Sequence, residues 1–232
     1  MDTLYVVGII LLFSAIILLQ TYLSYRQTKA VEAIAPQLNL AFVGNGHQQI
    51  PGIVQSLNLF SRGRSRRVRN VLRGRRNGMD VFVFDYFYTT GSRKHKRTHS
   101  YTLAVVQVDG LTVPAFSLVP KTLWHTIGGW FGYQDINFEG YPLFSKQYLL
   151  RGSDEVSIRQ LFNHHVFSFY TSKHSTCSEG IGNTLIYYRT GGKCHPQGWA
   201  SLLAQAQDVA RLLGRESTWE AEWDHNIYRH AE

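Results

Sequence analysis

The chain has 232 residues, with 24 Lys or Arg against 16 Asp or Glu, which gives a formal net charge of +8. This length suits a single domain that follows a membrane segment. Two cysteines, Cys177 and Cys194, exclude the disulfide framework of a small secreted protein. The count fits reduced thiols in a cytoplasmic domain, although one bridge between the two stays open.

Residues 3–25 form an apolar stretch without any charged side chain. As a helix this stretch would extend about 34 Å, and a bilayer core needs about 30 Å. Tyr5, Tyr22 and Tyr25 stand near its ends, where interfacial aromatic residues occur. A cleaved signal peptide needs a basic start, a shorter apolar core and a small-residue cleavage site, and these are missing. The stretch therefore predicts one transmembrane helix.

The charges that flank this helix predict its orientation. Asp2 precedes the apolar stretch, whereas Arg26 and Lys29 follow it. The positive-inside tendency then places the N-terminus outside and the C-terminal domain in the cytoplasm, as a single-pass protein. Residues 26–37 are expected to form a juxtamembrane helix or linker, because Pro36 disfavours a helical Ala35.

The soluble domain is expected over residues 38–213. Residues 38–43 suggest a strand, and residues 53–60 fit either a strand or a short helix. The clearest element is a hairpin of residues 67–75 and 79–89 around Asn77-Gly78, a pair that favours a tight primed turn. Further strands follow at 100–108 and 114–119.

The second half of the domain mixes helices and strands. The pattern predicts a helix at 121–130, an ordered loop at 131–145, a strand at 147–151 and a helix that Ser153 caps and that ends near Asn163. A second hairpin follows at 177–189. Residues 199–213 form an amphipathic helix that stops at Gly214, and residues 214–232 are expected to be a mobile tail. The fold class is therefore α+β, with an antiparallel meander sheet of five to seven strands packed by two or three helices.

The positive charge is concentrated between residues 62 and 97. This window holds twelve basic residues against Asp80 and Asp85, and the rest of the chain has twelve basic and fourteen acidic residues. The twelve are Arg62, Arg64, Arg66, Arg67, Arg69, Arg73, Arg75, Arg76, Arg93, Lys94, Lys96 and Arg97.

Four interpretations of this window compete. Basic residues beside a membrane anchor attract anionic lipid headgroups, each by about 1 kcal/mol. The same residues can bind an acidic protein partner, or they can form a solvated face that keeps the chain soluble. Arg-rich segments also bind nucleic acid, but the sequence has no helix-turn-helix, zinc-finger or RNA-recognition signature. Anionic lipid or an acidic partner is therefore the preferred binding hypothesis.

Two acidic residues in the 131–145 loop support an alternative, a membrane-tethered enzyme of unknown class. Asp135 and Glu139 can act as acid and base if their environments separate their pKa values, with His125 nearby. Such a spacing in a loop is more typical of a turn that caps backbone amides. The enzyme hypothesis predicts a deep pocket beside this loop.

Four other residues have side chains that bind zinc. His174, Cys177, Cys194 and His195 flank the second hairpin and offer nitrogen and sulfur ligands. Adjacent Cys194 and His195 fit poorly around one tetrahedral ion, so no metal is predicted. The sequence has no nucleotide-binding or nucleophile motif, and no cofactor is expected. Asp85 shares a strand face with Val81 and Val83, so we expect it to pair with an arginine of the neighbouring strand.

Several segments resemble a family of uncharacterised bacterial membrane-anchored proteins. They are Asn70-Val71-Leu72-x-Gly74, FDYFYTTGS, the run from Pro114 to Pro120, FGYQDINF and YLLRGSDEVSIRQLF. The resemblance covers about residues 38–213 and implies a bacterial inner-membrane setting. That family has no assigned activity, so the resemblance implies no mechanism and no site residues.

The sequence thus leads to one preferred function and one alternative. We expect a membrane-anchored protein whose cytoplasmic domain is an interaction module without enzymatic activity. Its Arg-rich hairpin would face anionic lipid or an acidic, still unidentified protein partner.

Overall fold

The computed structural model describes residues 2–92, 95–126, 134–173 and 175–214. Its centre is one antiparallel sheet of eight strands in the order β1-β2-β3-β4-β8-β7-β5-β6. The fold is α+β, as the sequence predicts, with one strand more than expected. The strands are β1 (Ala41–Gly44), β2 (Arg64–Arg76), β3 (Met79–Thr90), β4 (Arg97–Gln107), β5 (Val113–Pro120), β6 (Tyr148–Gly152), β7 (Thr176–Gly182) and β8 (Thr184–Arg189).

The sheet begins as a meander and is then completed by a hairpin from far along the chain. Strands β1 to β4 pair in sequence order, and the Asn77-Gly78 turn between β2 and β3 forms where the sequence predicts it. The β7–β8 hairpin then inserts between β4 and β5, so that β8 pairs with β4 and β7 pairs with β5. The Asp109-Gly110 turn therefore connects β4 to β5 although these strands are not neighbours in the sheet, because β8 and β7 lie between them.

The described helices are α1 (Asp2–Ile34), α2 (Asn58–Ser61), α3 (Pro142–Gln147), α4 (Glu155–Leu161), α5 (His164–Ser172) and α6 (Trp199–Gly214). Short 3-10 turns occur at Pro36–Leu38, His47–Gln49, Gly52–Ser56, Lys121–Thr126 and Pro196–Gly198. The sequence predicts a helix at 121–130, and its described part is the 3-10 turn Lys121–Thr126. Residues 127–130 lie outside the described residues. The predicted tail at 215–232 lies outside the described residues.

Two helix boundaries differ from the sequence-based expectation. Asp154, not Ser153, caps α4, and its Oδ1 accepts a hydrogen bond from the Ser157 backbone N–H at 3.0 Å. Helix α4 ends at Leu161, near the expected end at Asn163, and Asn163 caps an additional helix, α5, because its Oδ1 accepts from the backbone N–H groups of His165 and Val166. Both are ordinary N-cap side chains, but neither α5 nor its cap was expected.

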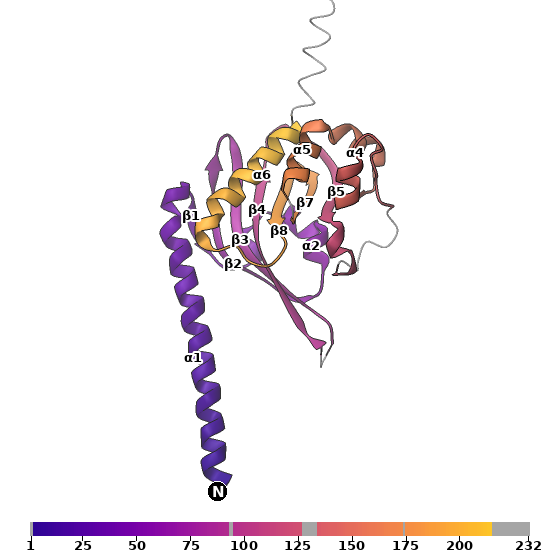
Figure 1. The fold of residues 1–232 in the computed structure, drawn as a ribbon. Helices are drawn as coiled ribbons and strands as arrows, with labels where there is room; N and C mark the ends of the chain where they lie inside the picture. Colours follow the sequence, from indigo (N-terminus) through magenta and orange to yellow (C-terminus); the bar gives the residue numbers. More distant parts are fainter. Residues whose placement is uncertain (1, 93–94, 127–133, 174, 215–232) are drawn as a thin grey trace, which may run out of the picture.

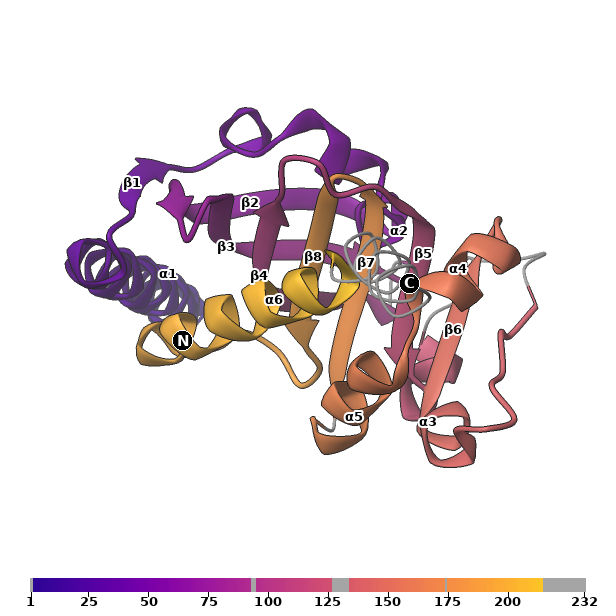
Figure 2. The ribbon, with the colours of Figure 1, turned by 90° about the horizontal axis from the view of Figure 1, so that it is seen from above.

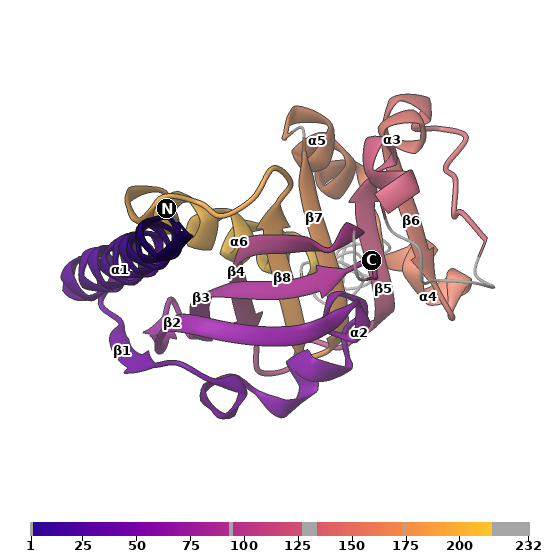
Figure 3. The same cartoon turned by 90° about the horizontal axis from the view of Figure 1, so that it is seen from below.

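The two faces of the sheet carry separate hydrophobic cores. On one face α6 lies across the strands, with α5 and α4 at the far end (Figure 2), and Trp199, Leu203 and Val209 are buried against Val83 and Tyr187. The opposite face, seen in Figure 3, is covered by the chain from Ile50 to α2. Alternation along β3 produces this division, because successive side chains of a strand point to opposite faces.

Helix α1 combines a span that is apolar with an end that belongs to the domain. Its apolar window has a mean hydropathy of 2.4 with none of it buried, which is long and apolar enough to cross a membrane. A core helix of a soluble protein would be buried instead. Further along, Val31 is fully buried in the larger core cluster, and the helix ends at Ile34 before Pro36. The predicted juxtamembrane helix is therefore a continuation of the apolar one.

Candidate functional site

A buried carboxylate joins α1 to the centre of the sheet. Asp85 of β3 is fully buried, and its Oδ2 accepts hydrogen bonds from Gln27 Nε2 at 2.8 Å and from Asn70 Nδ2 at 3.1 Å. Its Oδ1 accepts from Thr102 Oγ1 at 2.8 Å. The donors come from α1, β2 and β4, so this one carboxylate connects three elements.

The cationic partner of Asp85 is not the expected arginine. Lys193, in the loop before α6, places its Nζ 3.7 Å from Asp85 Oδ2 and donates to Gln27 Oε1 at 2.5 Å. The arginines of β2 remain at the surface, because their long side chains can reach solvent from an outer strand. Burial raises the pKa of Asp85, and Lys193 and the hydrogen bonds from Thr102 and Asn70 oppose this shift.

A bulge in β2 makes this network possible. Asn70 has a φ of 56°, in the left-handed region that Asn tolerates better than most residues. The strand register shifts between Arg69 and Leu72, which is the signature of an extra residue. The Asn70 side chain then reaches both Asp85 and Thr28, whose Oγ1 donates to Asn70 Oδ1 at 2.9 Å. A periodic strand pattern alone does not reveal such a bulge.

The basic window divides between a surface set and one buried residue. On β2 and at the start of β4 the described basic side chains are exposed, except that Arg76 is half-buried. Arg93 and Lys94 lie outside the described residues. The exposed set is Arg64, Arg66, Arg67, Arg69, Arg73, Arg75, Lys96 and Arg97.

Arg62 does not belong to this surface. Its side chain is only 10% exposed and its Nη2 lies 3.7 Å from Oε1 of Glu179, which is 1% exposed. Glu179 Oε2 also accepts a hydrogen bond from the Leu59 backbone N–H at 3.0 Å. Burial raises the pKa of Glu179, and Arg62 opposes this shift. Arg62 is therefore a structural cation of the α2 face, and its prediction as a surface binding residue is wrong.

The β3–β4 hairpin extends part of the basic surface to the side on which the apolar part of α1 projects. Figure 1 shows this hairpin extending from the domain on the side to which the N-terminal half of α1 projects. Exposed Lys96 and Arg97 lie at its end, and Arg64 Nη2 donates to the Gly91 carbonyl at 2.7 Å. The hairpin end is therefore basic and lies on the same side of the domain as the apolar part of α1.

The two candidate catalytic carboxylates do not share a site. Asp135 Oδ2 forms an ion pair with Lys121 Nζ at 2.7 Å, and its Oδ1 accepts from the Leu150 backbone N–H at 3.3 Å. Glu139 is exposed on the surface. The side chain of His125 lies outside the described residues. Asp135 therefore joins the segment before α3 to β6, which is a structural role, and residues 142–145 of the expected loop belong to α3.

The four candidate metal ligands are also dispersed. Cys177 is fully buried in the core on the α2 face, whereas Cys194 packs against the core on the α6 face. Both thiols are free. His195 is exposed, and His174 lies outside the described residues. Within the described ranges, no group of three or more His, Cys, Asp or Glu could hold a metal ion.

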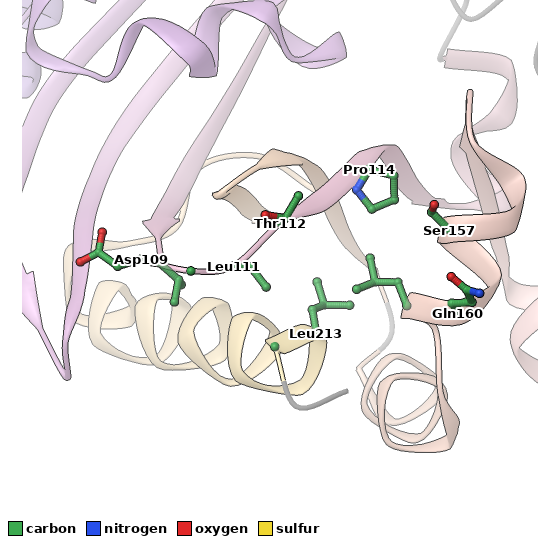
Figure 4. Close-up of a pocket in the computed structure, with 11 residues that line it drawn as sticks. Asp109, Leu111, Thr112, Pro114, Ser157, Gln160 and Leu213 are labelled. Carbon is green, nitrogen blue, oxygen red and sulfur yellow. The ribbon is translucent and has the colours of Figure 1, made fainter. Parts of the chain in front are cut away.

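A groove of about 600 Å³ lies where the β4–β5 turn meets the ends of α4 and α6. In Figure 4, Ser157 and Gln160 of α4 face it on one side and Leu111 and Leu213 on another. Asp109 is the only titratable group among its described lining residues, and its Oδ2 pairs with Arg75 Nη2 at 3.0 Å. The described groove thus lacks the paired acid and base of a hydrolytic site.

One solved structure has a similar fold. The crystal structure of mycobacterial trehalose monomycolate transport factor A, TtfA, aligns with a TM-score of 0.58 and 12% sequence identity, over 81% of this chain and 94% of that chain. The likeness is one of fold. At this identity it transfers no site, because one fold hosts many functions. No protein-family model matches the sequence, and no curated protein matches it either.

Proposed function

We propose that this protein is a single-pass membrane protein whose domain is an interaction module at the cytoplasmic surface of the inner membrane. In this proposal the basic end of the β3–β4 hairpin contacts anionic lipid headgroups. The main support is the geometry of α1, whose apolar part leaves the domain on the side of that hairpin (Figure 1).

Two further observations support a fixed position of the domain relative to α1. Val31 is fully buried in the core, and Gln27 donates a hydrogen bond to the buried Asp85. These contacts attach the last turns of α1 to the domain, so the helix and the sheet move together rather than through a flexible linker. The lipid-facing hairpin then stays near the headgroups without a separate binding step, which raises its effective concentration there.

The test uses the full-length protein in vesicles and a fluorescent label at Ser92, beside the hairpin end. Headgroup-attached quenchers should reduce the fluorescence more in vesicles with anionic lipid than in neutral vesicles. Added salt should remove the difference, since at physiological ionic strength attractions between exposed charges are largely screened beyond about 8 Å, and higher salt shortens this range. Equal quenching in both lipids, or no effect of salt, would contradict the lipid contact.

The orientation has its own test. A C-terminal green fluorescent protein should fluoresce, and a C-terminal alkaline phosphatase should be inactive, if the domain is cytoplasmic. The opposite pair of results would reverse the topology. The lipid-contact experiment on vesicles does not depend on this result.

The fold likeness to TtfA favours a second candidate, a factor in the transport of a lipid of its own membrane. TtfA is named for trehalose monomycolate transport, and the alignment covers 94% of it. This candidate predicts that crosslinking in native membranes, followed by affinity purification of the full-length chain, recovers a membrane transport protein. A vesicle-binding module without such a partner would support the first proposal alone.

A further inference from the structure

A cleft of about 400 Å³ lies between the juxtamembrane part of α1 and the outer edge of β2. Thr28 forms its wall on the α1 side, three residues after the uncharged stretch ends at Tyr25. That position corresponds to the headgroup layer when residues 3–25 span the hydrocarbon core. The residues that matter for its chemistry are Thr28, Asn45, His47, Arg66, Arg67 and Arg69.

The cleft is positively charged and its charge is not neutralised by the protein. None of its described lining residues is acidic, and in the described part of the chain no ion pair joins Arg66, Arg67 or Arg69 to a carboxylate. Asp85 lies opposite Arg69 in the strand register, but it is fully buried and engaged by Lys193 and three hydrogen-bond donors. Three arginines therefore line one open cleft without a paired carboxylate.

Arg66, Arg67 and Arg69 are held in place by ring and backbone contacts, none of which supplies a negative charge. Arg67 and Arg69 lie over the Phe87 ring, with guanidinium carbons 5.7 Å and 5.9 Å from its centroid. Arg66 Nη2 donates to the Ser61 carbonyl at 2.8 Å and to the Gly63 carbonyl at 3.1 Å, and its Nε donates to the Arg62 carbonyl at 3.2 Å. Such pre-positioning lowers the entropy lost on binding an anion.

The opposite wall supplies neutral groups. Thr28 Oγ1 lies beside Asn70, and the Asn45 carboxamide accepts the Asn70 backbone N–H at 2.8 Å. His47 lines the cleft, and its Nδ1 is buried with no hydrogen-bond partner among the described residues. A buried nitrogen without a partner is costly, and an anion in the cleft is the kind of ligand that can satisfy it.

We propose that this cleft binds the phosphate of one anionic phospholipid, and so gives the basic surface a specific headgroup site. Arginine forks match the oxygens of a phosphate group and bind them by paired, charge-assisted hydrogen bonds. The position of the cleft beside α1 favours a lipid of the surrounding bilayer over a soluble anion. This inference rests on the proposed function, because it requires α1 to lie in the membrane.

Native mass spectrometry of the full-length protein in a neutral detergent tests the proposal, with short-chain phosphatidylglycerol as the probe. We expect a saturable adduct of one lipid. In the double variant Arg67→Gln/Arg69→Gln its affinity should fall at least about tenfold, the change that a loss of about 1.4 kcal/mol produces. Unchanged affinity would overturn the proposal.

The matched control removes the same charge from the same strand. Arg73→Gln/Arg75→Gln alters two exposed arginines of β2 that do not line the cleft, and it should retain the adduct. An equal loss in both double variants would mean non-specific attraction and would also overturn the proposal. The circular dichroism and melting temperature of each variant confirm that it is folded.

A second arm uses inorganic phosphate as the competitor. Phosphate at concentrations near those of the lipid should not displace it, because the acyl chains also contact α1. Full displacement would show that the cleft takes a soluble phosphate and would overturn the assignment to lipid. The Ser92 quenching experiment separates this site from the proposed function, because Arg67→Gln/Arg69→Gln leaves Lys96 and Arg97 in place.

Discussion

Gln27, in the C-terminal part of α1, donates a hydrogen bond to the buried carboxylate of Asp85 over 2.8 Å. The same amide accepts from Lys193, so its two ends join the carboxylate and its cation. This contact makes the end of α1 an integral part of the folded domain. From the sequence alone, Gln27 falls in the segment 26–37 that is expected to be a juxtamembrane helix or linker.

The first prediction concerns this amide. Gln27→Ala removes a donor to a buried carboxylate and an acceptor from Lys193, so it should lower the free energy of unfolding by about 1–3 kcal/mol. Hydrogen exchange along residues 27–34 should also become faster. Lys29→Ala is the control, because Lys29 forms an exposed pair with Glu32 and should change stability much less than Gln27→Ala does. Equal effects of the two substitutions would contradict a structural role for Gln27.

The second prediction concerns pH. Burial raises the pKa of Asp85 in the folded protein, so between the ordinary value, about 3.9, and the raised value the folded state binds more protons than the unfolded state. Stability should therefore fall as pH increases through that range, and Asp85→Asn should remove this contribution. Melting temperatures from about pH 4 to 7 measure both slopes.

A second buried carboxylate provides the comparison for that measurement. Burial also raises the pKa of Glu179, so its contribution has the same sign and remains in Asp85→Asn. The double variant Asp85→Asn/Glu179→Gln should have the smallest slope of the three proteins. A slope in Asp85→Asn identical to that of the original chain would disprove the raised pKa of Asp85.

The third prediction separates Arg62 from the surface arginines. Arg62→Met leaves the Glu179 carboxylate buried without its cation, which should destabilise the protein by about 3–5 kcal/mol. Arg75→Met breaks an exposed pair with Asp109 and should cost at most about 1 kcal/mol. The double variant Arg62→Met/Glu179→Leu should recover much of the lost stability. Urea denaturation measures all three, and equal effects of Arg62→Met and Arg75→Met would be inconsistent with a buried pair.

The fourth prediction concerns the two thiols. Burial raises the pKa of Cys177 to about 12, and its side chain is fully buried, so a maleimide should label it only after unfolding. Half-buried Cys194 should react slowly in the folded protein. Mass spectrometry of Cys177→Ser and Cys194→Ser assigns each label. A disulfide between them in the native protein would contradict their placement in separate cores.

Local pattern was sufficient for the elements whose signals are short in range. The uncharged stretch at 3–25, the Asn77-Gly78 hairpin and the helix from Trp199 all appear where the sequence predicts them. Each depends on spacing within one segment, on turn residues or on hydrophobic periodicity. The antiparallel α+β class followed from the same signals.

The site could not be read from spacing because its residues come from distant segments. Lys193 rather than a β2 arginine reaches Asp85, and Arg62 finds Glu179 only after the β7–β8 hairpin inserts between β4 and β5. A run of arginines looks uniform in sequence, since nothing local distinguishes the one that will be buried. Whether an arginine is buried depends on the segments that pack against it, and these come from other parts of the chain.

The sequence by itself therefore determined the apolar helix, the strand-rich core and the position of the basic window along the chain, because apolar length, alternation and net charge are local quantities. Only the tertiary structure decided which of those charges face outward, which form buried pairs, and that the end of the apolar helix is bound to Asp85. Those outcomes depend on strand order and on one bulge at Asn70. Both are set by the packing of the whole sheet, where a contact between residues far apart in sequence outweighs local preference.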